Sequence, residues 1–158
     1  MPERSPRFAT AVATVLGVGR APLAPGTVGS AVAVAAGVPL LRVFGPWGLL
    51  VGATLAVIAG VWAAEVVAAS AGRADPSEVV IDEVAGQWIA LAAAPATWAG
   101  AAAAFVLFRL FDIMKPRPAS DAERLPGGIG IVADDLVAGL YAAAVLVLVA
   151  RLAPGALA

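Results

Sequence analysis

The chain has 158 residues, of which 61% are hydrophobic and only 13% are charged, and its mean hydropathy is +0.94. Soluble domains carry about 25% charged residues, so this composition favours a membrane protein over the alternative, a soluble alanine-rich helical protein. The absence of Cys and His excludes disulfides, the usual zinc ligands and thiolate or imidazole nucleophiles, and a net charge of −1 argues against a nucleic-acid partner.

The length fits a single domain covering residues 1–158. The first apolar run lacks a clear cleavage site, so no signal peptide is expected. Residues 5–18 are expected to form a helix, because their apolar residues recur at helical spacing. This helix could lie at the membrane interface or pack under the site. The apolar face of this helix would consist of Phe8, Val12, Val15 and Leu16.

A first helical hairpin is expected next. Segment 22–30 is rich in Pro and Gly and therefore predicts a loop, in which Thr27 or Ser30 could cap the following helix. Two apolar runs follow, separated by Gly45-Pro46. They predict helices at about 30–44 and 47–69.

The stretch 84–108 contains no charge in 25 residues, which is long enough to cross a membrane once. A single crossing would place its polar flanks on opposite sides, whereas a turn at Pro95 would return both flanks to one side. We therefore expect a second hairpin, with helices at about 78–94 and 98–113. These helices are only about 20 Å long, so the hairpin must be partly re-entrant or shielded by its neighbours. A last helix at about 134–152 completes an all-α, polytopic membrane bundle.

The distribution of charge supports this arrangement. All eleven acidic residues lie outside the uncharged stretches 43–64, 84–108 and 136–150. With both hairpins, every acid and eight of the ten basic residues fall on one side, and the far side keeps only Arg42 and Arg151. The positive-inside bias then predicts that the charged side is cytoplasmic.

Acidic residues cluster just before the second long apolar stretch. Acids at a helix start often only complement the helix macrodipole, which explains Asp75 and Glu78. It explains Asp82 and Glu83 poorly, because the apolar run begins directly after them, and ionisable residues at a membrane edge are functional candidates. Glu78 and Asp82 are four residues apart and are expected on one helix face.

A second charged motif lies at the end of the second hairpin. Arg109, Asp112 and Lys115 follow one another at intervals of three residues. They form either a ladder of structural ion pairs or a functional group, with Asp for a metal and the two cations for phosphate oxygens.

A glycine-rich segment precedes the last helix. Gly127, Gly128 and Gly130 could bring backbone amides close to an anion, although such a loop is often only a turn. The pair Asp134-Asp135 follows it and strengthens the functional interpretation. Adjacent carboxylates repel each other, and a divalent cation relieves that repulsion.

A set of carboxylates without His suits one or two Mg²⁺ ions acting on a phosphate ester. The expected metal ligands are Asp82, Glu83, Asp112, Asp134 and Asp135. The expected catalytic residues are Asp82, Glu83, Asp112 and Asp135. The substrate phosphate is expected to be bound by Thr27, Ser30, Arg109, Lys115, Gly127, Gly128 and Gly130.

The chain resembles the phosphatidylglycerophosphatase A family of bacteria in four segments: APGTVGS (24–30), DPSEVVIDEVAGQW (75–88), FRLFDIMKPRP (108–118) and GGIGIVADDLVAG (127–139). The resemblance implies a Mg²⁺-dependent enzyme of phospholipid biosynthesis that converts phosphatidylglycerophosphate, a membrane lipid, to phosphatidylglycerol and phosphate. It also implies a location in the bacterial cytoplasmic (inner) membrane.

Two other classes of protein remain as alternatives. A CDP-alcohol phosphotransferase also uses Asp clusters and Mg²⁺ in a membrane bundle, but its D-x-x-D-G-x-x-A-R pattern is absent from this sequence. A non-enzymatic carrier of divalent cations would need acids within the apolar spans, whereas the acids here flank them.

Overall fold

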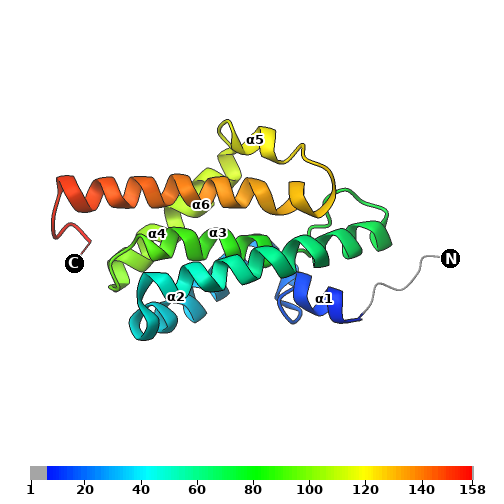
Figure 1. Ribbon diagram of the computed structural model, residues 1–158, viewed down its shortest axis with the longest axis horizontal. Coiled ribbons are helices and arrows are strands. Elements are labelled where there is room, and N and C mark those ends of the chain that lie inside the picture. The colour runs from blue at the N-terminus through cyan, green and yellow to red at the C-terminus, as the bar shows by residue number, and fades with distance from the viewer. Residues whose placement is uncertain (1–6, 158) are drawn as a thin grey trace.

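The computed structural model describes residues 7–157, and all regular secondary structure within that range is helical (Figure 1). The elements in chain order are α1 (Arg7–Ala13), the 3-10 turn η1 (Val18–Arg20), α2 (Pro25–Ala71), α3 (Ile81–Ala92), α4 (Trp98–Met114), α5 (Ala119–Ala122) and α6 (Gly127–Leu152). The long helices run roughly side by side along the length of the molecule. This arrangement confirms the predicted all-α bundle.

The first predicted hairpin is present as the two arms of α2. The break is at Gly45, whose φ of 66° and ψ of −173° are not helical. A left-handed φ favours glycine, and Pro46 cannot continue the hydrogen-bond ladder of the preceding arm. The chain therefore reverses at Gly45, and the arms are residues 25–44 and 46–71.

The second predicted hairpin is also present, with its turn around Pro95. Helix α4 begins at Trp98, and the Thr97 side chain caps it by accepting a hydrogen bond from the Gly100 amide. Helix α3 has 12 residues, or about 18 Å, and is too short to cross a bilayer alone. It is shielded as expected, because Ala85, Ala90 and Leu91 are all 0% exposed.

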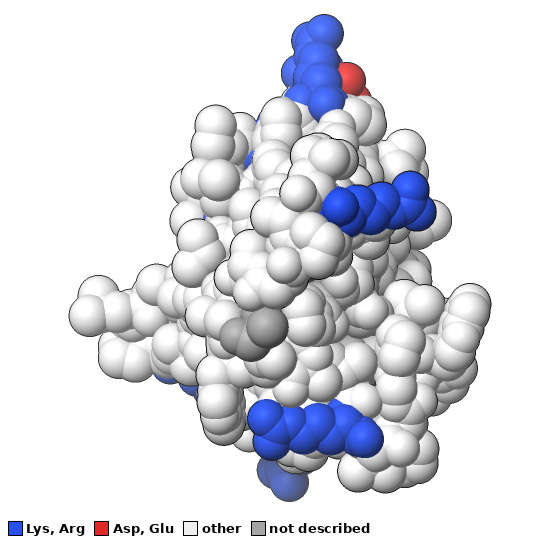
Figure 2. Space-filling model, turned by 90° about the vertical axis from the view of Figure 1, so that its left-hand side faces the viewer, with Lys and Arg blue, Asp and Glu red and all other residues white. Residues whose placement is uncertain are grey.

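Two helices, α2 and α6, are long and apolar enough to span a membrane. The loop after α2 and the start of α6 lie towards the right-hand end of Figure 1, close to α1. Figure 2 shows the opposite end, which is largely uncharged and has acidic atoms only at its upper margin. The polar segments therefore gather at one end of the membrane bundle, as the hairpins require.

Several predicted boundaries are wrong, and a tertiary contact explains one of them. The predicted helix 5–18 is helical only over Arg7–Ala13 within the described residues, because Val15 and Leu16 adopt positive φ. Its predicted apolar face is packed only in part: Val12 packs against the core, whereas Phe8 and Leu16 are 71% and 89% exposed, and the buried residues are Ala9 and Ala13. The main chain turns here because the Ala13 carbonyl accepts a hydrogen bond from the amide of Val80.

The remaining corrections concern helix starts. Helix α2 begins at Pro25, so the predicted loop 22–30 ends early. Helix α3 begins at Ile81, so Glu78 precedes it and does not share a helix face with Asp82; Glu78 instead pairs with Arg73 at 2.8 Å. Helix α6 begins at Gly127, not at residue 134.

Candidate functional site

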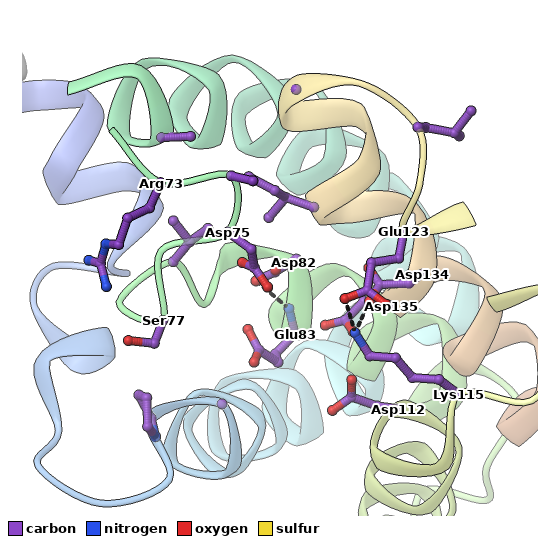
Figure 3. A pocket seen from close by; sticks show the side chains of 18 of the residues that line it. Arg73, Asp75, Ser77, Asp82, Glu83, Asp112, Lys115, Glu123, Asp134 and Asp135 are labelled. Atoms are coloured by element: carbon purple, nitrogen blue, oxygen red, sulfur yellow. Dashed lines mark hydrogen bonds and ion pairs between the residues drawn. The ribbon is translucent and has the colours of Figure 1, made fainter. Parts of the chain in front are cut away.

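A pocket of about 760 Å³ lies at the polar end of the bundle, where ends of α2, α3, α4 and α6 meet. Both ends of α2 contribute, with residues 24–26 from its start and Glu65 to Gly72 from its last turns. The pocket wall also includes the loop residues Asp75 and Ser77 (Figure 3). The two hairpins thus bring the polar segments of the sequence to one cavity.

The structure brings together all five carboxylates predicted as metal ligands. Asp82, Glu83 and Asp135 each place one oxygen within 4.8 Å of the others, and Asp112, Asp134 and Asp135 do the same. Asp135 belongs to both groups and is only 3% exposed. Since the five residues come from α3, α4 and α6, the site depends on the tertiary fold (Figure 3).

These carboxylates leave buried oxygens without hydrogen-bond partners. Glu83 Oε2, Asp134 Oδ1 and Asp135 Oδ2 have none among the residues the structure describes. Buried carboxylates that are close together and only partly paired are unfavourable, and bound divalent cations relieve this repulsion. Oxygen-only donor sets are those that Mg²⁺ and Ca²⁺ prefer, so the residues present fit a hard divalent cation.

Arg109 lies on the α4 side of the carboxylates. Its Nη1 forms an ion pair with Asp112 and lies 3.9 Å from Glu83 Oε1. The Arg109 side chain is 15% exposed, and its Nε makes no hydrogen bond within the described residues. Arg109 therefore positions two of the candidate ligands, Glu83 and Asp112. Its Nε–H group remains available to donate a further hydrogen bond beside the pocket.

Lys115 links α4, α5 and α6 through two ion pairs. Its Nζ lies 2.8 Å from Asp134 Oδ2 and 2.9 Å from Glu123 Oε1. Burial lowers the pKa of Lys115, but the hydrogen bonds and charges of Asp134 and Glu123 outweigh it and hold the pKa above its usual 10.5. The ammonium group therefore remains charged near neutral pH. Burial also raises the pKa of the Asp75 carboxyl, against the attraction of Lys115.

Gly26 allows the start of α2 to approach the site. A β-carbon at this position would overlap Glu83 Oε1 and would stand 3.2 Å from Arg109 Nη1. The main chain of α2 at Gly26 therefore packs directly against the Glu83–Arg109 ion pair. The other predicted phosphate ligands of this segment lie elsewhere: Thr27 and Ser30 do not line the pocket, and the buried Ser30 hydroxyl donates to the Gly26 carbonyl.

The predicted glycine-rich loop is the first turn of α6. Gly127 lines the pocket, but the amide of Gly128 already donates to Glu65 Oε2 at 2.5 Å. Gly128 and Gly130 are buried and do not line the pocket. Of the three glycines proposed for phosphate binding, the structure therefore brings only Gly127 to the cavity.

Glu65 is a site residue that the sequence pattern does not predict. It caps the start of α6 from the last turns of α2, where a carboxylate also complements the helix macrodipole. A lone acid at the end of an apolar run was the available signal. Glu123, Asp75 and Ser77 also line the pocket and were not predicted.

We expect Glu65→Ala to destabilise the protein by about 1–3 kcal/mol, because it leaves the buried Gly128 amide without its charged acceptor. Glu65→Gln keeps an acceptor oxygen and should lose less. Thermal unfolding of the detergent-solubilised variants measures both effects. Equal stability of Glu65→Ala and the wild type would show that this contact does not hold α6 to α2.

The family model and the relatives that this sequence matches all carry the names of lipid phosphatases. Residues 11–150 match the family model described as phosphatidylglycerophosphatase A. A protein of Bacteroides thetaiotaomicron named "Putative phosphatidylinositol-3-phosphatase" is 40% identical over 149 residues, which cover 89% of this chain and 91% of the relative. No solved structure matches the chain.

Two further relatives carry the family name. Phosphatidylglycerophosphatase A of Escherichia coli is 39% identical over 140 residues, covering 85% of this chain and 79% of the relative. Phosphatidylglycerophosphatase A of Haemophilus influenzae is 40% identical over 125 residues, covering 78% of this chain and 77% of the relative. Together with the carboxylate-lined pocket, these matches show that the chain is a phosphatase and belongs to the phosphatidylglycerophosphatase A family.

Proposed function

We propose that this protein is a Mg²⁺-dependent enzyme that converts phosphatidylglycerophosphate to phosphatidylglycerol and inorganic phosphate. One observation carries the proposal: the five carboxylates predicted as metal ligands, together with the cations Arg109 and Lys115, line one pocket at the polar end of an apolar bundle. A lipid phosphomonoester has the matching chemistry, since its phosphate bears negative charge and its acyl chains belong in the membrane. The names of the relatives from E. coli and H. influenzae support the same substrate.

Asp82, Glu83 and Asp135 would hold one cation, and Asp112, Asp134 and Asp135 would hold a second. Bound Mg²⁺ supplies Lewis-acid stabilisation of the charge that develops on the phosphoryl and leaving oxygens. Arg109 and Lys115 bind the remaining phosphate oxygens as fixed positive charges. Their ion pairs to Asp112 and Asp134 keep these groups oriented before the substrate arrives.

The proposed reaction is hydrolysis of one phosphorus–oxygen bond. The oxygen of water bonds to phosphorus as the bond to the terminal glycerol oxygen breaks, and one water proton ends on that glycerol oxygen. A carboxylate of the pocket takes the proton from the attacking water and passes it on, as a general base and then a general acid. The products are a lipid with a free hydroxyl and inorganic phosphate.

The proposed location is the bacterial cytoplasmic (inner) membrane, with the pocket facing the cytoplasm. The relatives from E. coli and H. influenzae are bacterial, and α2 and α6 can span a membrane. Most basic residues share the pocket's side of the chain, which the positive-inside rule places in the cytoplasm. Nucleic acid is not a proposed partner, because the net charge is −1.

Phosphate release by the purified protein tests the function. The substrates are phosphatidylglycerophosphate, phosphatidic acid and phosphatidylinositol 3-phosphate, each with and without Mg²⁺. The inositol lipid is the second candidate, because the relative from B. thetaiotaomicron carries that substrate in its name. We expect the highest kcat/KM with phosphatidylglycerophosphate; a higher value for the inositol lipid would reassign the substrate, and no release from any lipid would refute the proposal.

Arg109→Lys tests the phosphate-binding role. Lysine keeps the charge but loses the bidentate geometry of the guanidinium, so we expect kcat/KM to fall about tenfold or more, roughly 1.4 kcal/mol. Arg117→Lys is the matched control, because Arg117 is 78% exposed and pairs only loosely with Asp121 at 3.8 Å. Wild-type kinetics for Arg109→Lys would reduce Arg109 to a structural partner of Asp112.

A further inference from the structure

The helices around the pocket do not pack equally closely against one another. We use the word seam for the line of contact between two neighbouring helices. Between α3 and α6, a β-carbon at Gly86 would overlap the Asp135 carbonyl, and one at Gly139 would overlap the Gly86 carbonyl. Between α2 and α6, a β-carbon at Gly128 would overlap the Val61 carbonyl. On these two sides the helix backbones touch, so no lipid can pass between them.

Two further seams are also closed. Gly29 of α2 packs against the Val80 side chain at the start of α3, at 2.9 Å from its potential β-carbon. Between α4 and α6, the rings of Phe111 and Tyr141 lie 5.4 Å apart, and the Tyr141 hydroxyl donates to the Arg117 carbonyl at 2.6 Å. Lys115 adds an ion pair across the same seam.

The seam between the start of α2 and the end of α4 is built differently. Residues 24–26 of one segment and Arg109, Asp112 and Ile113 of the other line the pocket. The three atoms that would lie nearest to a β-carbon at Gly26 all belong to side chains, two to the Glu83 carboxylate and one to the Arg109 guanidinium. At Gly26 this side is therefore closed by polar side chains, whereas the four sides described above are closed by touching helix backbones, by the apolar Val80 side chain or by packed rings.

The outer edges of this seam are apolar. Leu23 directly precedes the α2 segment and is 81% exposed, and Ile113 and Met114 at the end of α4 are 70% and 66% exposed. Leu110 and Val106 continue the exposed face of α4 by one and two turns. Exposed apolar residues of this kind on a membrane bundle face the acyl chains of lipids.

We propose that the pocket opens sideways into the bilayer between residues 24–26 and the face of α4 that carries Arg109, Asp112 and Ile113, and that the lipid substrate enters through this lateral opening. The phosphate enters the pocket, while the acyl chains stay outside against Leu23, Ile113 and Met114. The Glu83–Arg109 pair lies directly inside the opening, so the guanidinium is the first cation that an entering phosphate meets. This inference rests on the proposed function, because it assigns a route to a lipid substrate.

A reversible bridge across the lateral opening tests the route. The chain contains no Cys, so Ala24→Cys/Ile113→Cys offers two unique and exposed thiols. These are joined with a cleavable bifunctional thiol reagent, and reduction removes the bridge. The matched control is Phe111→Cys/Tyr141→Cys, which bridges the already closed seam between α4 and α6. Each protein is assayed with long-chain phosphatidylglycerophosphate in mixed micelles and with a short-chain analogue dispersed as monomers.

We expect the bridge between positions 24 and 113 to lower kcat/KM for the long-chain lipid at least tenfold, with recovery after reduction. Turnover of the short-chain analogue should stay within twofold, because a dispersed monomer can reach the pocket from the cytoplasmic side that it is proposed to face. The control bridge should leave both substrates within twofold. Unchanged turnover of the long-chain lipid, or equal loss with both substrates, would overturn the lateral route. If the unbridged protein released phosphate from neither substrate, the proposed function itself would fail and the route with it.

A single substitution gives a second measurement that does not depend on bridging. Ile113→Arg places a charge on the apolar edge of the opening, so we expect KM for the long-chain lipid to rise at least fivefold with little change in kcat. Leu16→Arg is the control, because Leu16 is 89% exposed but does not line the pocket. Identical KM values for the two variants would count against the opening.

Discussion

Asp135→Asn is expected to lower kcat/KM for phosphatidylglycerophosphate by at least about 1,000-fold, roughly 4 kcal/mol of transition-state stabilisation. Asp135 belongs to both groups of three carboxylates, so its replacement weakens both candidate cation sites at once. Asparagine preserves the size of the side chain and keeps one oxygen, but it removes the charge that a divalent cation requires. Phosphate release under saturating Mg²⁺ measures the loss.

A second prediction for Asp135→Asn concerns its unfolding temperature and separates loss of the site from misfolding. Asp135 is buried, and its Oδ2 has no hydrogen-bond partner among the described residues. Removing its charge should therefore raise the unfolding temperature in the absence of divalent cations, because fewer carboxylates repel one another. Asp121→Asn is the control, since that carboxylate is 47% exposed and pairs with Arg117 and Arg124 outside the carboxylate groups. An active Asp135→Asn enzyme would remove this residue from the site.

The architecture was predictable because its main determinants are local. Gly45-Pro46 and Pro95 interrupt long apolar runs, and each interruption is a hairpin turn in the structure. The exclusion of charge from those runs then forces the polar segments to one end of the bundle. For the same reason the five carboxylates could be grouped from the sequence, although they are spread between residues 82 and 135.

The errors concern features that depend on contacts distant in sequence. The sequence favours an anion-binding loop at Gly128 and Gly130, but in the structure these glycines let α6 approach α2 and the chain preceding α6. A glycine needed for close helix packing and one needed for anion binding look identical in sequence. Ser30 has the same ambiguity, because its hydroxyl is satisfied by the backbone one turn earlier. Glu65 was missed because its partner, the Gly128 amide, is 63 residues away.

Removal of divalent cations is the second change for which we expect a large effect. Treatment with EDTA should abolish phosphate release, and Mg²⁺ should restore it. Chelation should also lower the unfolding temperature, because the oxygens of each group of three carboxylates lie within 4.8 Å of one another and would repel without the proposed cation. At an effective dielectric constant of about 20, two unit charges at that distance repel by roughly 3 kcal/mol.

Two comparisons separate this electrostatic effect from a general effect of EDTA. Bound cation stabilises the folded protein by RT ln(1 + [L]/Kd), so the unfolding temperature of the wild type should rise with Mg²⁺ concentration. Asp135→Asn should lose most of that dependence, since it lacks the carboxylate that both groups share, whereas Asp121→Asn should keep it. If Asp135→Asn and the wild type showed the same rise with Mg²⁺, the cation would bind elsewhere and the assignment of the carboxylate groups as its site would be wrong. If the wild type hydrolysed its substrate at full rate in EDTA, no freely exchanging divalent cation would take part in the reaction, and the positive charge at the pocket would have to come from Arg109 and Lys115 alone.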